Sequence, residues 1–212
     1  EREIILIPGT EEMPYDMVDS DKFLSSSKNY NLIKYLNSDS KDITVITTIK
    51  NFKKKIIHKE ILKKNTIIIK KTNSINIQEI KKKLTNIGYT NSPQVNFSGE
   101  FSIRGSIIDI FPGGYNLPIR IDLDDINIET IKFFNVENQI TFKDAEDFCL
   151  YITPMNNIVF NEENIINFRK KFREIFPGNP NNNEIYSSVS NNIMPQGINN
   201  FFPLFYKDTS FF

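Results

Sequence analysis

The 212-residue sequence has one cysteine, one alanine and no tryptophan, and only five of its 26 basic residues are arginines. A lone Cys149 cannot build a disulfide framework within the chain, which is typical of proteins from a reducing cytosol. The apolar run at residues 4–7 is too short for a signal peptide, and no run approaches the roughly 20 residues of a membrane span. We therefore expect a cytoplasmic protein without a membrane segment.

Net charge is also absent, because 26 acidic residues balance the 26 basic ones. A neutral chain has no overall field that would attract nucleic acid or a membrane surface. The charges are nevertheless unevenly placed: residues 50–99 hold twelve lysines, and residues 100–147 hold ten acids. Folding does not explain a nearly alanine-free, lysine-rich chain, so we attribute it to codon bias. Arginine is the more informative cation in such a sequence.

The first third of the chain alternates strand and helix patterns. Short apolar runs at 4–7 and 43–47, with a helical pattern at 29–36 between them, predict a piece of parallel α/β structure. Apolar residues then recur at helical spacing over 52–62, and a further strand is expected at 66–70.

The rest of the chain begins with a capped helix and continues with strands. Asn76 and Glu79 suit the start of a helix and Gly88 its end. Residues 97–152 read as short strands and turns, which predicts an antiparallel sheet, and 161–176 has the charge order of a helix. We predict a mixed α/β and α+β fold, with a partial parallel α/β domain and an inserted antiparallel-sheet domain.

Two of the five arginines, Arg104 and Arg120, lie in one hairpin-like stretch, "GEFSIRGSIIDIFPGGYNLPIRIDL". Apolar and charged residues alternate around Arg120, so its side chain is expected to face solvent. A bulge at Gly105 within the first strand would bring Arg104 and Asp109 to the same outer face. Folding about the Gly-rich turn then places Asp109 opposite Arg120, with Arg104 roughly 15 Å farther along the strand.

Two interpretations of this hairpin remain open on pattern alone. In the first, Arg120 and Asp109 form an exposed cross-strand ion pair worth less than about 1 kcal/mol, and Arg104 is simply solvated. In the second, the two arginines form a docking face for carboxylates of a partner.

The order of residues in this stretch resembles the second domain shared by bacterial transcription-repair coupling factors and the excision-repair protein UvrB. The residues that carry the motif are Gly99, Glu100, Phe101, Arg104, Gly105, Asp109, Phe111, Pro112, Arg120 and Asp122. The segments "EEMPYD" (11–16) and "MPQGINNFFPLFY" (194–206) extend the resemblance over nearly the whole chain. Little chain follows residue 16 before the next helix pattern, which leaves no room for UvrB's long DNA-handling hairpin and favours the coupling factor.

The resemblance implies a non-catalytic module that recruits the damage-recognition ATPase UvrA. It divides the chain into part of a first α/β domain (1–65), the UvrB domain 2-like docking domain (66–152) and part of a third domain (153–212). The UvrA-binding positions that it implies are Arg104, Gly105, Asp109, Arg120, Asp122 and Asp124. RNA polymerase and DNA would be bound only by other domains of a longer parent protein.

Some positions depart from the family pattern. The family usually has two phenylalanines where this chain has Leu123 and Asp124, and an acid at the position of Asn199. Such losses also fit a third hypothesis, a folded remnant that no longer binds UvrA.

The sequence contains no phosphate-binding G-x-x-x-x-G-K-[ST] loop. We expect no catalytic residues, cofactor or metal in this segment, since the family's ATP-driven motor lies downstream. An alternative function is non-specific nucleic-acid binding by the lysines of residues 50–71. Its candidate residues are Lys53, Lys54, Lys55, Lys63 and Lys64. Only Phe52 in this block could stack on a base, and it falls on the apolar side of the predicted helix.

Overall fold

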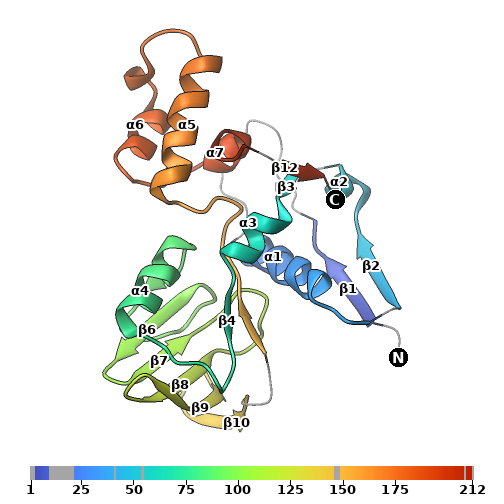
Figure 1. Ribbon diagram of the computed structural model, residues 1–212, viewed down its shortest axis with the longest axis vertical. Coiled ribbons are helices and arrows are strands. Elements are labelled where there is room, and N and C mark those ends of the chain that lie inside the picture. The colour runs from blue at the N-terminus through green and yellow to red at the C-terminus, as the bar shows by residue number, and fades with distance from the viewer. Residues whose placement is uncertain are drawn as a thin grey trace.

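The computed structural model of the chain describes residues 3–9, 22–40, 42–53, 55–145, 149–207 and 209–211 (Figure 1). The "EEMPYD" segment at 11–16 lies outside the described residues. The described part contains two hydrophobic cores. One is formed by residues between 5 and 62 together with residues between 158 and 206, and the other by residues between 69 and 155. The domain boundaries drawn from the sequence stay a prediction.

The N-terminal part is a parallel strand pair beside a long helix, as the sequence predicts. Strand β1 (Glu3–Ile7) pairs in parallel with β2 (Ile43–Thr47), and helix α1 (Lys22–Leu36) connects them. The helix is longer than the predicted 29–36. Ile5 and Ile7 are buried in the first core, whereas alternate positions of β1 face outward.

The single amphipathic helix expected over 52–62 is wrong. This segment forms three short elements instead: α2 (Ile49–Phe52), β3 (Lys55–Ile57) and α3 (Lys59–Lys64). Strand β3 pairs antiparallel with β12 (Thr209–Phe211), which lies about 150 residues farther along the chain. The β-branched Ile56 and Ile57 suit this strand, and their long-range pairing overrides the helical spacing of the apolar residues.

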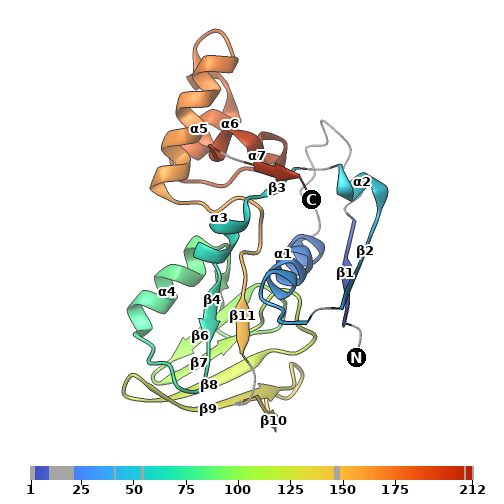
Figure 2. The ribbon, with the colours of Figure 1, turned by 45° about the vertical axis from the view of Figure 1, so that its right-hand side comes forward.

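A group of helices above β3 completes the first core (Figures 1 and 2). The largest is α5 (Glu162–Ile175), which confirms the helix predicted over 161–176 and begins with an Asn161 side-chain cap. The other helices are α6 (Glu184–Ser190), α7 (Phe202–Phe205), and two short 3₁₀ turns at Pro180–Asn182 and Ile198–Phe201. Phe168 on α5 stacks on Phe205 with ring centroids 4.8 Å apart.

The second core lies under a six-stranded sheet with the order β10-β9-β8-β7-β6-β5. The strands are β5 (Thr90–Asn91), β6 (Glu100–Arg104), β7 (Ile107–Ile110), β8 (Ile119–Asp124), β9 (Asn127–Phe134) and β10 (Thr141–Asp144). All neighbours are antiparallel except β5 and β6, so the predicted antiparallel sheet is confirmed in its main part.

Helix α4 (Ile77–Asn86) covers the inner face of this sheet. The Asn76 side chain accepts hydrogen bonds from the backbone N–H groups of Gln78 and Glu79, which confirms the predicted cap. Ile80 and Leu84 of α4 pack in the second core with apolar residues of the inner sheet face. The sheet strands that carry Arg104 and Arg120 therefore rest on a packed layer.

Strands β4 (Ile67–Ile69) and β11 (Leu150–Ile152) form a separate antiparallel pair outside the six-stranded sheet. The sequence predicted the strand at β4, but it placed the segment of β11 in the large sheet. Helix α1 packs closely against the Gly-rich loop that contains Gly113 and Gly114. The Tyr30 ring lies 4.8 Å from that of Tyr115, and the Asn29 side chain donates a hydrogen bond to the Pro154 carbonyl at 2.9 Å.

The mixture of a parallel strand pair, an antiparallel sheet and packed helices confirms the predicted α/β and α+β fold class. Across the described residues, no helix combines the length and the apolar character that a membrane span requires.

Candidate docking surface

Arg104 lies at the end of β6, and the chain reverses directly after it. Gly105 and Ser106 form a two-residue turn, and Arg104 pairs with Ile107 across it. Gly105 has a positive φ of 59°, which glycine adopts readily at the first position of such hairpin turns. The predicted bulge at Gly105 is therefore wrong, because β6 and β7 are separate antiparallel strands.

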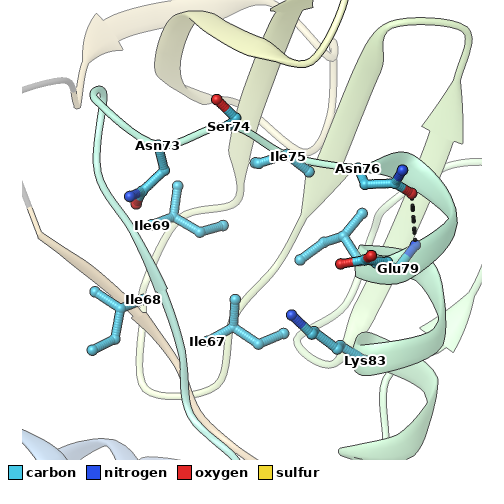
Figure 3. Close-up of a pocket in the computed structure, with 10 residues that line it drawn as sticks. Ile67, Ile68, Ile69, Asn73, Ser74, Ile75, Asn76, Glu79 and Lys83 are labelled. Atoms are coloured by element: carbon cyan, nitrogen blue, oxygen red, sulfur yellow. Dashed lines mark hydrogen bonds between the residues drawn. The ribbon is translucent and has the colours of Figure 1, made fainter.

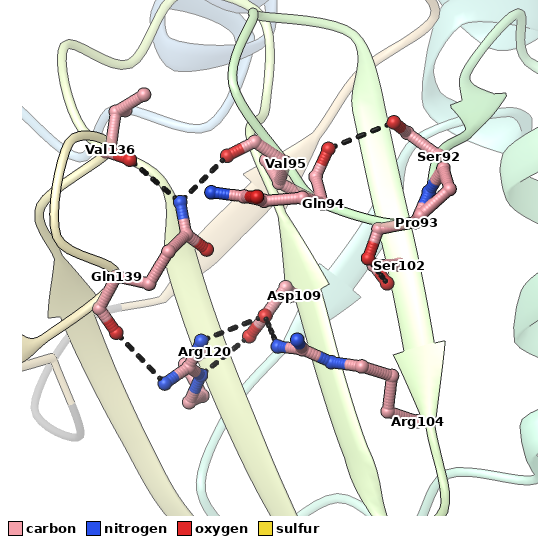
Figure 4. A network of polar contacts seen from close by, with 10 residues as sticks. All are labelled: Ser92, Pro93, Gln94, Val95, Ser102, Arg104, Asp109, Arg120, Val136 and Gln139. Atoms are coloured by element: carbon pink, nitrogen blue, oxygen red, sulfur yellow. Dashed lines mark hydrogen bonds and ion pairs between the residues drawn. The ribbon is translucent and has the colours of Figure 1, made fainter.

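This turn brings Arg104 to Asp109 instead of placing it about 15 Å away. The Arg104 Nη2 atom lies 2.6 Å from Asp109 Oδ2 (Figure 4). Arg120 is opposite Asp109 on β8, as predicted, and binds the same carboxylate. Its Nε lies 2.7 Å from Oδ1 and its Nη2 lies 2.9 Å from Oδ2. One carboxylate therefore holds both arginines.

Asp109 is buried, which contradicts the expectation that it faces solvent. Its side chain is 1% exposed, whereas the side chains of Arg120 and Arg104 are 17% and 50% exposed. Hydrogen bonds to a charged partner strengthen when water is excluded, so this ion pair differs from the weak exposed pair of the first interpretation. The hydrogen bond to Asp109 also raises the pKa of Arg120 above its ordinary value, so the guanidinium stays charged.

Asp109 is buried because the loop that contains Pro93 and Val95 crosses the outer face of the sheet. The Pro93 carbonyl accepts a hydrogen bond from Ser102 Oγ on β6, and the Val95 carbonyl accepts one from the Gln139 side chain. The loop therefore passes over β7 and β8, where Asp109 and Arg120 lie (Figure 4). Val95 itself is fully buried.

Gln139 and Phe134 complete the surroundings of Arg120, and neither was predicted from the sequence. The Gln139 carbonyl accepts a hydrogen bond from Arg120 Nη1 at 3.1 Å, and the guanidinium carbon lies 4.8 Å from the centre of the Phe134 ring. One signal was available in the sequence. Adjacent Phe133 and Phe134 on one strand point to opposite faces, so an aromatic side chain had to be covered on the outer face as well.

The other implied positions lie around this cluster in different settings. Asp122, on the same strand as Arg120, accepts a hydrogen bond from Thr130 Oγ1 at 2.6 Å. Asp124 is exposed at the end of β8, while Leu123 beside it is buried in the second core. Gly105 has open space around it, since no heavy atom lies within 4 Å of the position of an added Cβ. The structure thus brings Arg104, Asp109 and Arg120 together, with Asp124 at the rim.

The lysine block does not form the single charged helix face that nucleic-acid binding would use. Lys53 follows α2, Lys55 begins β3, and Lys63 and Lys64 end α3; Lys54 lies outside the described residues. Phe52, expected on an apolar helix face, is exposed. The lysines are therefore spread over three short elements, and no observation favours this alternative.

A separate cavity of about 220 Å³ lies between β4 and α4 on the inner side of the sheet domain (Figure 3). Half of its lining residues are isoleucines, including Ile67 and Ile69, and the other half are polar or charged, including Glu79 and Lys83. These lining residues include no cysteine or histidine, and the Ser74 hydroxyl donates a hydrogen bond to the Asn127 side chain at 3.1 Å.

Residues 67–156 match the UvrB interaction domain family. The chain is 28% identical over 208 residues to a transcription-repair-coupling factor of Haemophilus influenzae, covering 98% of this chain and 18% of the relative. It is 26% identical over 198 residues to that of Escherichia coli, covering 93% of this chain and 17% of the relative. It is 37% identical over 130 residues to that of Borreliella burgdorferi, covering 61% of this chain and 12% of the relative.

The chain therefore spans less than a fifth of the length of these relatives. Its match to the UvrB interaction domain includes the whole hairpin with Arg104, Asp109 and Arg120. The resemblance drawn from the motif is confirmed: the chain is similar, over nearly its whole length, to a segment of the transcription-repair coupling factors that contains a UvrB interaction domain.

Proposed function

We propose that this chain is the UvrA-recruiting module of a transcription-repair coupling factor and performs no catalysis itself. The observation that carries the proposal is the Arg104 guanidinium, half exposed and tied to a buried carboxylate on a packed sheet. In this role the module links a stalled RNA polymerase to nucleotide excision repair. RNA polymerase, DNA and ATP would be bound by other parts of the parent protein, and a cytoplasmic location remains a prediction.

The chemistry of the surface supports an acidic partner site. Arginine presents planar donors that match a carboxylate in two parallel hydrogen bonds, and arginine is common among the residues that dominate protein interfaces. The arginines here project from β6 and β8, on either side of β7, so little backbone ordering is needed on binding. The match to the UvrB interaction domain covers these same strands.

Calorimetric titration of the purified chain with UvrA tests this proposal. We expect a dissociation constant in the micromolar range or tighter, and a loss of about 2 kcal/mol or more in Arg104→Ala and Arg120→Ala. Arg169→Ala is the matched control, because Arg169 is an exposed arginine on α5, outside the sheet. It should bind like the unmodified chain.

Absence of binding by a folded, unmodified chain would overturn the proposal. It would favour the remnant hypothesis, with Asp124 as the first residue to examine. Equal losses in Arg169→Ala and Arg104→Ala would point to a general charge effect instead of a docking face.

A further inference from the structure

The three charged side chains of the docking surface differ in what they can reach. We propose that Asp109 and Arg120 are positioning residues, which hold the Arg104 guanidinium in one orientation so that Arg104 binds a carboxylate of the partner. The identity of that partner rests on the proposed function. The positioning itself is a property of this chain alone.

Asp109 cannot contact a partner in this structure. Its side chain is 1% exposed, and both of its oxygens accept hydrogen bonds from arginine. Oδ1 is bound by Arg120 Nε, and Oδ2 is shared between Arg120 Nη2 and Arg104 Nη2. The contribution of Asp109 to docking must therefore pass through the two arginines.

Arg120 has most of its binding capacity committed inside the domain. Three of its nitrogens donate, two to Asp109 and one to the Gln139 carbonyl, and the guanidinium carbon lies over the Phe134 ring. With 17% of its side chain exposed, it has little area to offer a partner. Its rigid position in turn fixes the Asp109 carboxylate.

Arg104 is the member of the cluster that faces outward. Its bond to Asp109 uses Nη2, and within the described residues Nε and Nη1 have no hydrogen-bond partner. An arginine has five N–H donors in a planar group, so the remaining donors can bind a second carboxylate in bidentate fashion. The exposed half of the Arg104 side chain carries a positive charge, which suits an acidic side chain of a partner.

Holding Arg104 in place lowers the cost of binding. A free arginine side chain samples many rotamers, and fixing it on binding reduces the affinity. The bond to Asp109 fixes the guanidinium before the partner arrives. The proposal therefore predicts that Asp109 matters for docking only while Arg104 is present.

The first test uses the chain alone. The sequence has only five arginines, which makes the Nε–Hε signals of Arg104 and Arg120 straightforward to assign. Relaxation of the ¹⁵N nucleus should give Arg104 an order parameter above about 0.6, which falls below that value in Asp109→Asn. Equal mobility of Arg104 in both proteins would overturn the positioning role.

The second test is a double-mutant cycle for UvrA binding with Arg104→Gln, Asp109→Asn and the combined variant. We expect the first to weaken binding at least tenfold and the second about fivefold. The combined variant should bind no more than twofold weaker than Arg104→Gln. A full fivefold further loss in the Arg104→Gln background would show that Asp109 acts independently, and would overturn the proposal.

Two controls keep the tests decisive. Thermal unfolding of each variant establishes that it is folded. If Asp109→Asn does not fold, Arg120→Lys takes its place in both tests. Lysine keeps the positive charge but cannot bind the Asp109 carboxylate with two nitrogens. If the unmodified chain does not bind UvrA, the proposed function fails, and the relaxation measurement still decides whether Asp109 holds Arg104.

Discussion

Arg120 and Asp109 form a bidentate ion pair between neighbouring strands, with Nε–Oδ1 and Nη2–Oδ2 distances of 2.7 and 2.9 Å. The register of β7 and β8 places the two residues directly opposite each other. A loop over the sheet and the Phe134 ring exclude water from the pair. The pair thus joins β7 and β8, and its carboxylate also binds Arg104 at the end of β6.

We predict that Asp109→Ala lowers the free energy of unfolding by about 3 kcal/mol, because it leaves the largely buried Arg120 guanidinium without its carboxylate. Urea denaturation of the purified chain would measure this loss. Asp144→Ala is the control, since Asp144 is exposed on the edge strand β10, and it should change stability by no more than about 0.5 kcal/mol. A loss below about 1 kcal/mol in Asp109→Ala would mean that water replaces the carboxylate.

We predict that Gly114→Ala destabilises the protein by about 3 kcal/mol, through both backbone strain and overpacking. Gly114 has a φ of 83°, and an added Cβ would lie 2.5 Å from Tyr30 Cβ on α1. Gly178 offers a matched control, because its φ is 99° but no heavy atom lies within 4 Å. Gly178→Ala should cost only about 1 kcal/mol in the same denaturation experiment. Equal losses would show that α1 does not pack against the loop.

We predict that stability falls as the pH rises above about 10, in part because of Tyr89. Burial raises the pKa of Tyr89 above its ordinary value, and its hydroxyl donates to the Thr153 carbonyl. The unfolded chain loses this proton near pH 10 while the folded chain keeps it, so the stabilisation is complete below pH 10 and is lost above it. Tyr89→Phe should reduce the slope by about 1.4 kcal/mol per pH unit, measured by urea denaturation between pH 8 and 11. An unchanged slope would contradict the prediction.

We predict that Asp124→Phe tightens UvrA binding about tenfold. Asp124 is exposed at the end of β8, at the position where the family resemblance leads us to expect an aromatic residue. An aromatic side chain there would add apolar contact area at the edge of the interface. Calorimetry would compare it with Asp124→Asn, which removes the charge alone. An equal gain in Asp124→Asn would assign the effect to charge, and no gain in either would place residue 124 outside the interface.

The sequence determines those elements whose signals are local. The apolar run of β2 gives a strand with its predicted bounds, and Asn76 caps α4 because a side-chain oxygen reaches N–H groups two and three residues away. The alternation in β8 and the Gly-rich turn give the pairing of Asp109 with Arg120. Periodicity and capping act over a few residues, so they can be read without the fold.

Only the tertiary structure decides what lies against these elements. The helical spacing at 52–62 fails because β3 pairs with β12, a partner distant in sequence. Asp109 is buried because a loop crosses the outer face of the sheet, and no pattern within the strand records that loop. Arg104 meets Asp109 because Gly105 begins a turn rather than a bulge, and glycine permits either. The sequence alone therefore determined the strands that carry Arg104, Asp109 and Arg120, whereas contacts between distant segments decided which charge is buried and which one faces outward.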